Sequence, residues 1–225
     1  MQFVKQFAYL IQDHTMLLPP PPLPINLVDY LACFSNLKSL NISRYSLDQQ
    51  VVDYIFTNLV PRLSKLSLTG CSLNLTTIPT SVLRLVANVE HLDFSDSSLS
   101  VNSLSQLANA IKEASILSFE NVLQNRNNNN INNDSSPKLT TLIMAANGLT
   151  ENRAELILEG TRYCKSIRLI DLSYNKIKFE MLEQQFLFLR NHPVETLILK
   201  NNWLGNCVDS FVQNLPANLK VLGKF

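Results

Sequence analysis

Few residues in this sequence could perform chemistry, and most of them stand alone. The side chains best suited to metal binding or nucleophilic catalysis are three histidines and four cysteines: His14, His91, His192, Cys33, Cys71, Cys164 and Cys207. Only His91 has possible partners nearby, because Asp93 follows two residues later and Glu90 and Asp96 flank the pair. In a strand, His91 and Asp93 would share one face. They could form a weak metal site, but a solvated charged face is the favoured interpretation.

Other catalytic signatures are missing from the sequence. The five glycines, at 70, 148, 160, 205 and 223, are too far apart for a dinucleotide-binding or phosphate-binding loop. There is no Gly-x-Ser-x-Gly nucleophile motif. A cysteine–histidine pair would need Cys71 beside His91, but Cys71 is expected in the interior, where a thiol is usually inert. We therefore expect no enzyme, no cofactor and no metal.

Composition narrows the function classes further. The chain has 225 residues and a net charge of +1, so no overall field favours nucleic acid or an acidic membrane. The segment from Met1 to Leu18 is interrupted by polar residues, which argues against a secretory core or a membrane span. Scattered cysteines are typical of a reducing compartment, so we expect a cytoplasmic protein.

A repeat dominates the remaining sequence. The pattern Leu37-x-x-Leu40-x-Ile42 recurs with starts at 37, 63, 89, 114, 139, 167, 194 and 219, so that successive starts are 26, 26, 25, 25, 28, 27 and 25 residues apart. The copy Ala114-x-x-Leu117-x-Phe119 is degenerate, and the last, Leu219-x-x-Leu222, is partial. Strands are expected near 39–42, 65–68, 91–94, 116–119, 141–144, 169–172 and 196–199.

Two periods alternate within each repeat. The leucine core has the period of two that a strand with one buried face requires. The residues that follow have helical spacing, as in Leu104, Leu107, Ala108 and Ile111. Strand then helix, repeated, predicts an α/β fold: a right-handed solenoid with a concave parallel sheet and helices on the convex side.

Position nine of each repeat should carry a buried amide that satisfies backbone groups where the chain leaves the strand. Asn147, Asn175 and Asn202 occupy it in three successive repeats. Cys71 and Ser97 could substitute in part, whereas Tyr45 and Val122 are unsuited.

The segment Ile167-Arg-Leu-Ile170-Asp-Leu172-Ser-Tyr-Asn175-Lys-Ile177 resembles the leucine-rich-repeat superfamily, over residues 25–225. Repeat length and helical outer face resemble the cytosolic ribonuclease-inhibitor-like type. Leu158-Glu159-Gly160 resembles, more weakly, the repeat arm of the capping-protein/myosin-I-linker family of actin regulators. This resemblance implies that the chain binds another macromolecule.

Two segments depart from the repeat. Residues 1–24 are predicted to form an N-terminal helix, with Phe3, Phe7, Leu10 and Ile11 on one face, and a proline-rich spacer at 17–24. The prolines could alternatively be a ligand for an EVH1 domain. The Asn-rich tract 124–136 is interpreted as a disordered loop within the domain 25–225, or else as a self-associating segment.

The concave face is the predicted partner site, since residues at positions three, five, seven and eight point toward it. An apolar stripe with charged and aromatic neighbours is expected there: His91, Asp93, Ile116, Ile143, Leu169, Asp171, Tyr174, Ile198 and Lys200. The sequence thus predicts a non-catalytic protein-interaction module; the alternative is the repeat arm of a larger actin-regulatory protein. Self-association through an uncapped C-terminal end, beyond Leu222, is a further expectation.

Overall fold

The computed structural model describes residues 27–127, 137–178, 189, 191–203 and 219–222. The predicted N-terminal helix and proline-rich spacer lie outside this range, as do residues 128–136 of the Asn-rich tract.

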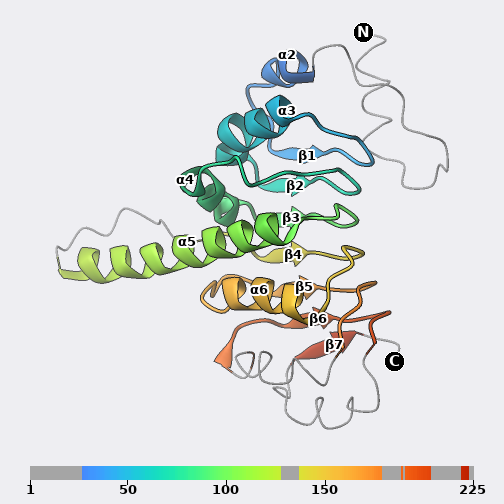
Figure 1. The fold of residues 1–225 in the computed structure, drawn as a ribbon. Helices are drawn as coiled ribbons and strands as arrows, with labels where there is room; N and C mark the ends of the chain where they lie inside the picture. Colours follow the sequence, from blue (N-terminus) through green and yellow to red (C-terminus); the bar gives the residue numbers. More distant parts are fainter. Residues whose placement is uncertain (1–26, 128–136, 179–188, 190, 204–218, 223–225) are drawn as a thin grey trace.

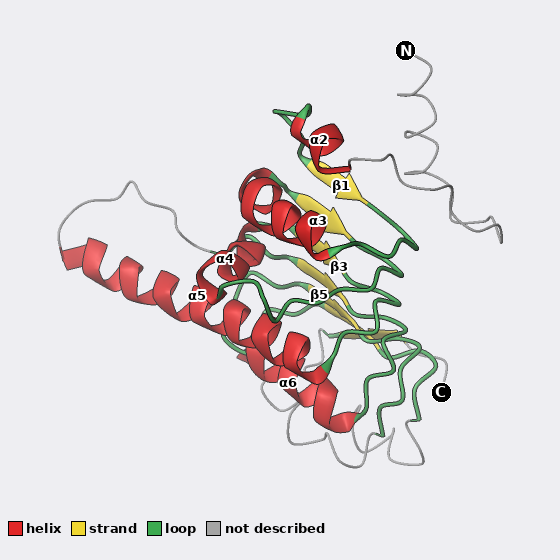
Figure 2. Cartoon of the chain, turned by 45° about the horizontal axis from the view of Figure 1, so that its top comes forward, coloured by secondary structure: helices red, strands yellow, loops and turns green. Residues whose placement is uncertain are grey.

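One parallel sheet runs the length of the molecule (Figure 1). Its order follows the sequence, with parallel pairing at each step. The strands are β1 (Ser39–Asn41), β2 (Lys65–Ser67), β3 (His91–Asp93), β4 (Thr141–Ile143), β5 (Leu169–Asp171), β6 (Thr196–Ile198) and β7 (Lys220–Leu222). The helices lie on the other side of the coil (Figure 2). The chain therefore folds as the predicted right-handed leucine-rich-repeat solenoid.

One of the seven predicted strand positions is wrong. Residues 116–119 lie within a long helix, α5 (Val101–Asn127), and β3 pairs directly with β4, Leu92 opposite Leu142. The stripe of Leu104, Leu107 and Ile111 continues at helical spacing through Ser115 and Ser118, all of them buried, and no glycine or proline interrupts it. Seven strands are therefore described where eight repeats were expected.

The last strand is one residue out of its predicted register. Val221, and not Leu222, lies opposite Leu197 of β6. The Leu219-x-x-Leu222 pattern gave the right strand but the wrong alignment, because Leu, Val and Leu at 219, 221 and 222 satisfy two registers almost equally.

The other helices are short. They are α2 (Leu27–Ala32), α3 (Gln49–Tyr54), α4 (Thr80–Leu83) and α6 (Glu151–Thr161), with a π-helical turn at Ile55–Leu59 and 3₁₀ turns at Val60–Arg62 and Arg84–Asn88. Asp48 caps the N-terminus of α3, and its Oδ1 accepts from the N–H of Val51 at 2.8 Å. The predicted outer helix with Leu182 and Phe186 lies outside the described residues.

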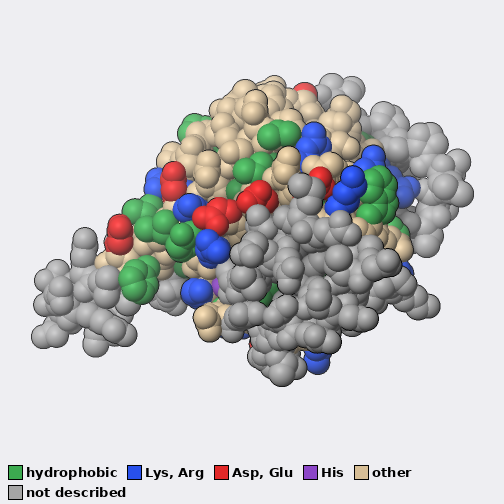
Figure 3. Space-filling model, turned by 60° about the horizontal axis from the view of Figure 1, so that its bottom comes forward, with side chains coloured by type: hydrophobic (Ala, Val, Ile, Leu, Met, Phe, Trp, Pro, Cys, Tyr) green, Lys and Arg blue, Asp and Glu red, His purple; other side chains and the backbone are tan. Residues whose placement is uncertain are grey.

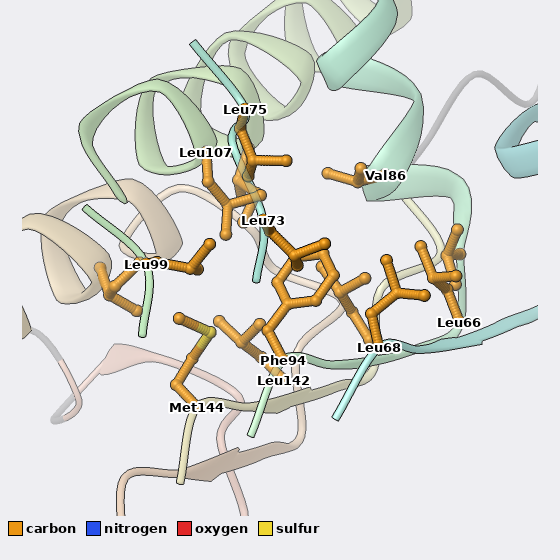
Figure 4. Close-up of a cluster of buried hydrophobic side chains, with 14 of the residues drawn as sticks. Leu66, Leu68, Leu73, Leu75, Val86, Phe94, Leu99, Leu107, Leu142 and Met144 are labelled. Carbon is orange, nitrogen blue, oxygen red and sulfur yellow. The ribbon is translucent and has the colours of Figure 1, made fainter. Parts of the chain in front are cut away.

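The core fills the space between the sheet and the helices (Figure 4). Phe94 lies near its centre, between side chains of the strands, such as Leu68 and Met144, and side chains from the helical layer, such as Val86 and Leu107. A second ring, that of Phe56, lies 6.4 Å from the Phe94 ring, centroid to centroid. Each repeat thus buries its apolar face against its neighbours.

The predicted amide ladder is present. Asn147 Nδ2 donates to the Phe94 carbonyl at 2.8 Å, and Asn175 Nδ2 donates to the Met144 carbonyl at 3.0 Å. Each side chain therefore reaches the carbonyl at position six of the preceding strand segment.

Smaller side chains continue the same ladder toward the N-terminus. Ser97 Oγ donates to the Leu68 carbonyl at 2.7 Å, and Cys71 Sγ donates to the Ile42 carbonyl at 3.4 Å. Partial substitution by Cys71 and Ser97 is confirmed. Val122, in contrast, lies in α5 and not at the end of a strand.

The α5 and α6 helices pack closely at Gly160. A Cβ atom placed there would lie 2.6 Å from the Ala108 carbonyl oxygen, so only glycine permits this approach. Beside this point Lys112 Nζ lies 3.2 Å from Glu159 Oε1 and 5.2 Å from the centroid of the Tyr163 ring. Leu158-Glu159-Gly160 therefore has a packing role in this chain, independent of the actin-regulator resemblance.

His192 is a buried histidine whose pKa is shifted. Burial, followed by the positive charge of Lys165, lowers its pKa from 6.5 to about 4; backbone carbonyls of Thr161 and Cys164 oppose the shift, and Arg168 adds to it. The side chain is 7% exposed, so the folded protein holds the imidazole neutral at pH 7.

This burial predicts a loss of stability in mild acid. Below pH 6.5 His192 is protonated in the unfolded chain, but in the folded protein it stays neutral until about pH 4. Its contribution to the free energy of unfolding is therefore complete above pH 6.5 and decreases as the pH falls. At pH 5 the expected loss is about 2 kcal/mol. Urea unfolding at pH 7 and pH 5 should show this loss for the natural chain but not for His192→Gln, which keeps the same carboxylates. Equal losses in both proteins would contradict the assignment.

Candidate protein-binding surface

The sheet brings six of the nine predicted partner residues to one face, and Tyr174 and Lys200 follow its strands β5 and β6. His91 and Leu169 belong to one row across the strands, and Asp93, Ile143, Asp171 and Ile198 to the other. All six are exposed or half-buried, as a solvent-facing sheet requires. Ile116 is the exception: it was placed on the concave face but lies on α5, on the helical side of the molecule.

The apolar stripe is not continuous. Leu169 pairs with Thr141 and Thr196, whereas Ile143 and Ile198 flank Asp171 in the neighbouring row. The surface is therefore a mixed patch in which aliphatic side chains surround one carboxylate. Such a mixture is typical of non-obligate protein interfaces.

The aspartates on this surface also order the chain as it leaves the strands. Asp171 Oδ1 accepts from the N–H of Ser173 at 2.8 Å, and Asp93 Oδ1 accepts from the N–H and hydroxyl of Ser95 at 2.9 and 2.6 Å. Asp93 Oδ2 accepts weaker bonds from Ser67 and Thr69. Hydroxyl and amide groups already occupy the Asp93 carboxylate, which favours the charged-face interpretation over a metal site.

Across the described part of the chain, no three histidine, cysteine or acidic side chains gather into a group that could hold a metal ion. Cys71 lies in the buried ladder, and burial, its largest influence, raises the pKa of its thiol. His91, by contrast, is exposed on the sheet, so the two do not form a nucleophilic pair.

A row of left-handed residues borders the concave face. Position eight of successive repeats has a φ between 55° and 68° and is occupied by Arg44, Gly70, Asp96, Ala146, Tyr174 and Asn201. This conformation turns the N–H of one repeat toward the next, so that Tyr174 donates to the Lys200 carbonyl at 2.7 Å. Glycine, asparagine and aspartate tolerate it; a tyrosine rarely adopts it.

Tyr174 is therefore the most unusual residue of the surface. Its φ is 56°, its side chain is 53% exposed, and Lys200 Nζ lies 5.6 Å from the ring centroid. Backbone strain at an exposed aromatic is a known mark of a functional position, because folding alone would favour a residue with less strain. Sequence reasoning identified the aromatic side chain but not the strain.

Removing this strain is expected to stabilise the protein. Tyr174→Asn should raise the free energy of unfolding by about 0.5 kcal/mol, because relief of the left-handed strain exceeds the loss of an exposed cation–π contact. Tyr163→Asn is the matched control, since Tyr163 also lies beneath a lysine but has no positive φ. Urea unfolding should show the control slightly destabilised. A destabilised Tyr174→Asn protein would refute the strain argument.

Comparison with known proteins adds little to this geometry. No family model and no curated protein sequence matches the chain. Among solved structures, an internalin from Listeria monocytogenes superposes with a TM-score of 0.46 and 14% sequence identity, over 84% of this chain and 47% of the internalin. The chain thus spans about half the length of that protein. The fold assignment rests instead on the repeat and on the register of the seven strands.

The described helices also bear on membrane association. None of them is both long enough and apolar enough to cross a bilayer.

Proposed function

We propose that this chain is a non-catalytic, cytoplasmic protein-interaction module that binds a protein partner on its concave face. The observation that carries the proposal is Tyr174, which has a positive φ, is exposed and follows β5, the strand of Leu169 that lies between the strands of the half-buried Ile143 and Ile198. An exposed aromatic beside aliphatic residues and one charge, Asp171, supplies the usual components of a binding hot spot.

The concave face makes a specific prediction for partner capture. Ile143→Glu combined with Tyr174→Ala should abolish capture of the partner from a native extract, because a buried charge and a lost anchor together remove several kcal/mol of binding free energy, on the order of a hundredfold or more in affinity. Mass spectrometry of the captured proteins would identify the partner, and circular dichroism would check the fold.

A matched control lies at the other end of the sheet. Asn41→Glu and Arg44→Ala change the equivalent positions of the first repeat and should leave capture intact. Undiminished capture by the Ile143→Glu, Tyr174→Ala protein would place the binding surface elsewhere.

The alternative, a repeat arm of a larger actin-regulatory protein, gains no specific support, since helix packing accounts for Gly160. Self-association beyond β7 also stays a proposal, because the residues after Leu222 lie outside the described range.

A further inference from the structure

The C-terminal repeats carry a second surface feature next to the concave face. After β5 and β6 the chain continues as two neighbouring segments, Leu172–Lys178 and Leu199–Trp203, which contain three lysines and no carboxylate. We call Tyr174, Lys176, Lys178, Lys200 and Trp203 the lysine–aromatic cluster.

Backbone pairing holds the two segments side by side. Tyr174 donates its N–H to the Lys200 carbonyl at 2.7 Å, and Trp203 donates its N–H to the Ile177 carbonyl at 3.0 Å. Lys178 and Trp203 form a parallel bridge, so their side chains leave the backbone on the same face. The cluster is therefore fixed at both ends by main-chain hydrogen bonds.

Alternation directs the lysines outward. Ile177 is buried, whereas Lys176 and Lys178 on either side of it are exposed. Both lysines thus point away from the core, on the face that also bears Trp203. At the border with the concave face, Lys200 lies over the Tyr174 ring. Lys and Arg side chains lie beside hydrophobic side chains on the right of the space-filling view (Figure 3).

The charges of the cluster are not balanced by the part of the chain that the structure describes. Within the described residues none of the three lysines pairs with a carboxylate, whereas Lys112, Arg84, Arg162 and Arg168 do so elsewhere in the molecule. Trp203 is 60% exposed, an unusual state for a tryptophan. Three lysines that pair with no described carboxylate, together with two exposed aromatic rings, favour a negatively charged ligand that also offers apolar groups.

We propose that this cluster binds an acidic, extended segment of the protein partner, one that carries carboxylates and an interspersed apolar side chain. This inference rests on the proposed function, because the segment would continue from the concave face across Tyr174. A single nucleic-acid strand fits less well. Three lysines supply fewer phosphate contacts than nucleic-acid-binding surfaces commonly use, the chain carries a net charge of only +1, and Asp171 lies at the border.

Trp203 gives a direct test, because it is the single tryptophan of the chain and its fluorescence reports on the cluster alone. The probe is an oligo-glutamate peptide with a central leucine, titrated into the full chain. We expect a saturable change in Trp203 fluorescence that weakens as salt is added. A glycine–serine peptide of the same length should cause no change. No saturable change with the acidic peptide would overturn the proposal, and tighter binding of an oligo-thymidine of equal charge would overturn it in favour of nucleic acid.

Charge-neutral variants locate the site. Lys176→Gln, Lys178→Gln and Lys200→Gln together should weaken peptide binding about tenfold, since each exposed pair contributes only a fraction of a kcal/mol. Lys38→Gln, Lys65→Gln and Lys138→Gln remove the same charge at other exposed positions and should have little effect. Equal weakening by the two triple variants would mean that net charge, and not the cluster, attracts the peptide.

The two proposals can fail separately. If Ile143→Glu abolishes partner capture but the Lys176, Lys178, Lys200 variant captures the partner undiminished, the concave-face function stands and the acidic-segment inference fails. If the acidic peptide binds the cluster but Ile143→Glu, Tyr174→Ala leaves capture intact, the inference about the ligand stands and the concave-face function fails.

Discussion

Replacing Asn175 by alanine is expected to lower the free energy of unfolding by about 3–4 kcal/mol. The Asn175 amide makes five hydrogen bonds: Nδ2 donates to the carbonyls of Met144, Leu172 and Ser173, and Oδ1 accepts from the N–H groups of Asn147 and Leu149. Alanine would leave these buried backbone groups without a partner, and each such group costs about 1–3 kcal/mol when water cannot reach it. Urea unfolding followed by circular dichroism would measure the loss.

The neighbouring asparagine at 201 provides the control, although not as an alanine variant. Asn201 has a φ of 56°, so alanine there would add left-handed strain unrelated to the ladder. Asn201→Gly avoids that strain and removes an exposed side chain, and should change stability by less than about 0.5 kcal/mol. Similar losses for Asn175→Ala and Asn201→Gly would mean that the ladder contributes little.

The second large effect is expected at the contact between α5 and α6. Gly160→Val should destabilise the protein by about 3 kcal/mol, even though valine is a better helix former than glycine. The three atoms nearest to a Cβ at this position are the O, Cα and C of Ala108, at 2.6, 2.7 and 2.9 Å, so the clash is with backbone and no side-chain rotamer can relieve it.

A second substitution makes this argument testable. Ala108→Gly should not rescue Gly160→Val, because the obstructing atoms remain in place. Thermal unfolding of the two single variants and the double variant forms a complete cycle. Recovery of stability in the double variant would show that the Ala108 methyl group, and not the backbone, sets the helix separation.

The outcome at particular residues shows what the sequence determines in this fold. Leu40, Leu66 and Leu92 were placed correctly because burial of alternate residues in a strand permits few registers. Ala114, Leu117 and Phe119 were misplaced because their spacing matches the strand pattern. In the structure the buried stripe of α5 continues through Ser115 and Ser118 instead, which leaves Leu117 and Phe119 exposed. The shifted register of β7 has a different origin, because Leu219, Val221 and Leu222 fit two strand registers almost equally.

The candidate site was harder to predict for a different reason. His91, Asp171 and Ile198 follow from strand alternation, which is local. The positive φ of Tyr174 depends on hydrogen bonds to the following repeat, and the exposure of Trp203 depends on pairing with Lys178. The residue type alone predicts neither property. Gly70 was a signal for the first of them, because glycine tolerates a positive φ and occupies position eight of the second repeat.

The direct pairing of β3 with β4 has a consequence for folding. The Leu92–Leu142 contact closes a segment nearly twice as long as the one closed by Leu66 and Leu92. Because the entropy of loop closure grows with the logarithm of length, this doubling costs only about 0.6 kcal/mol. Each repeat contacts chiefly its immediate neighbours, so folding propagates from repeat to repeat. The pairing of β3 with β4 should therefore form almost as easily as the pairing of any other two strands. The α5 segment is in effect an insertion between two strands that still pair in register. Its length can therefore change during evolution without changing the register of the repeats on either side.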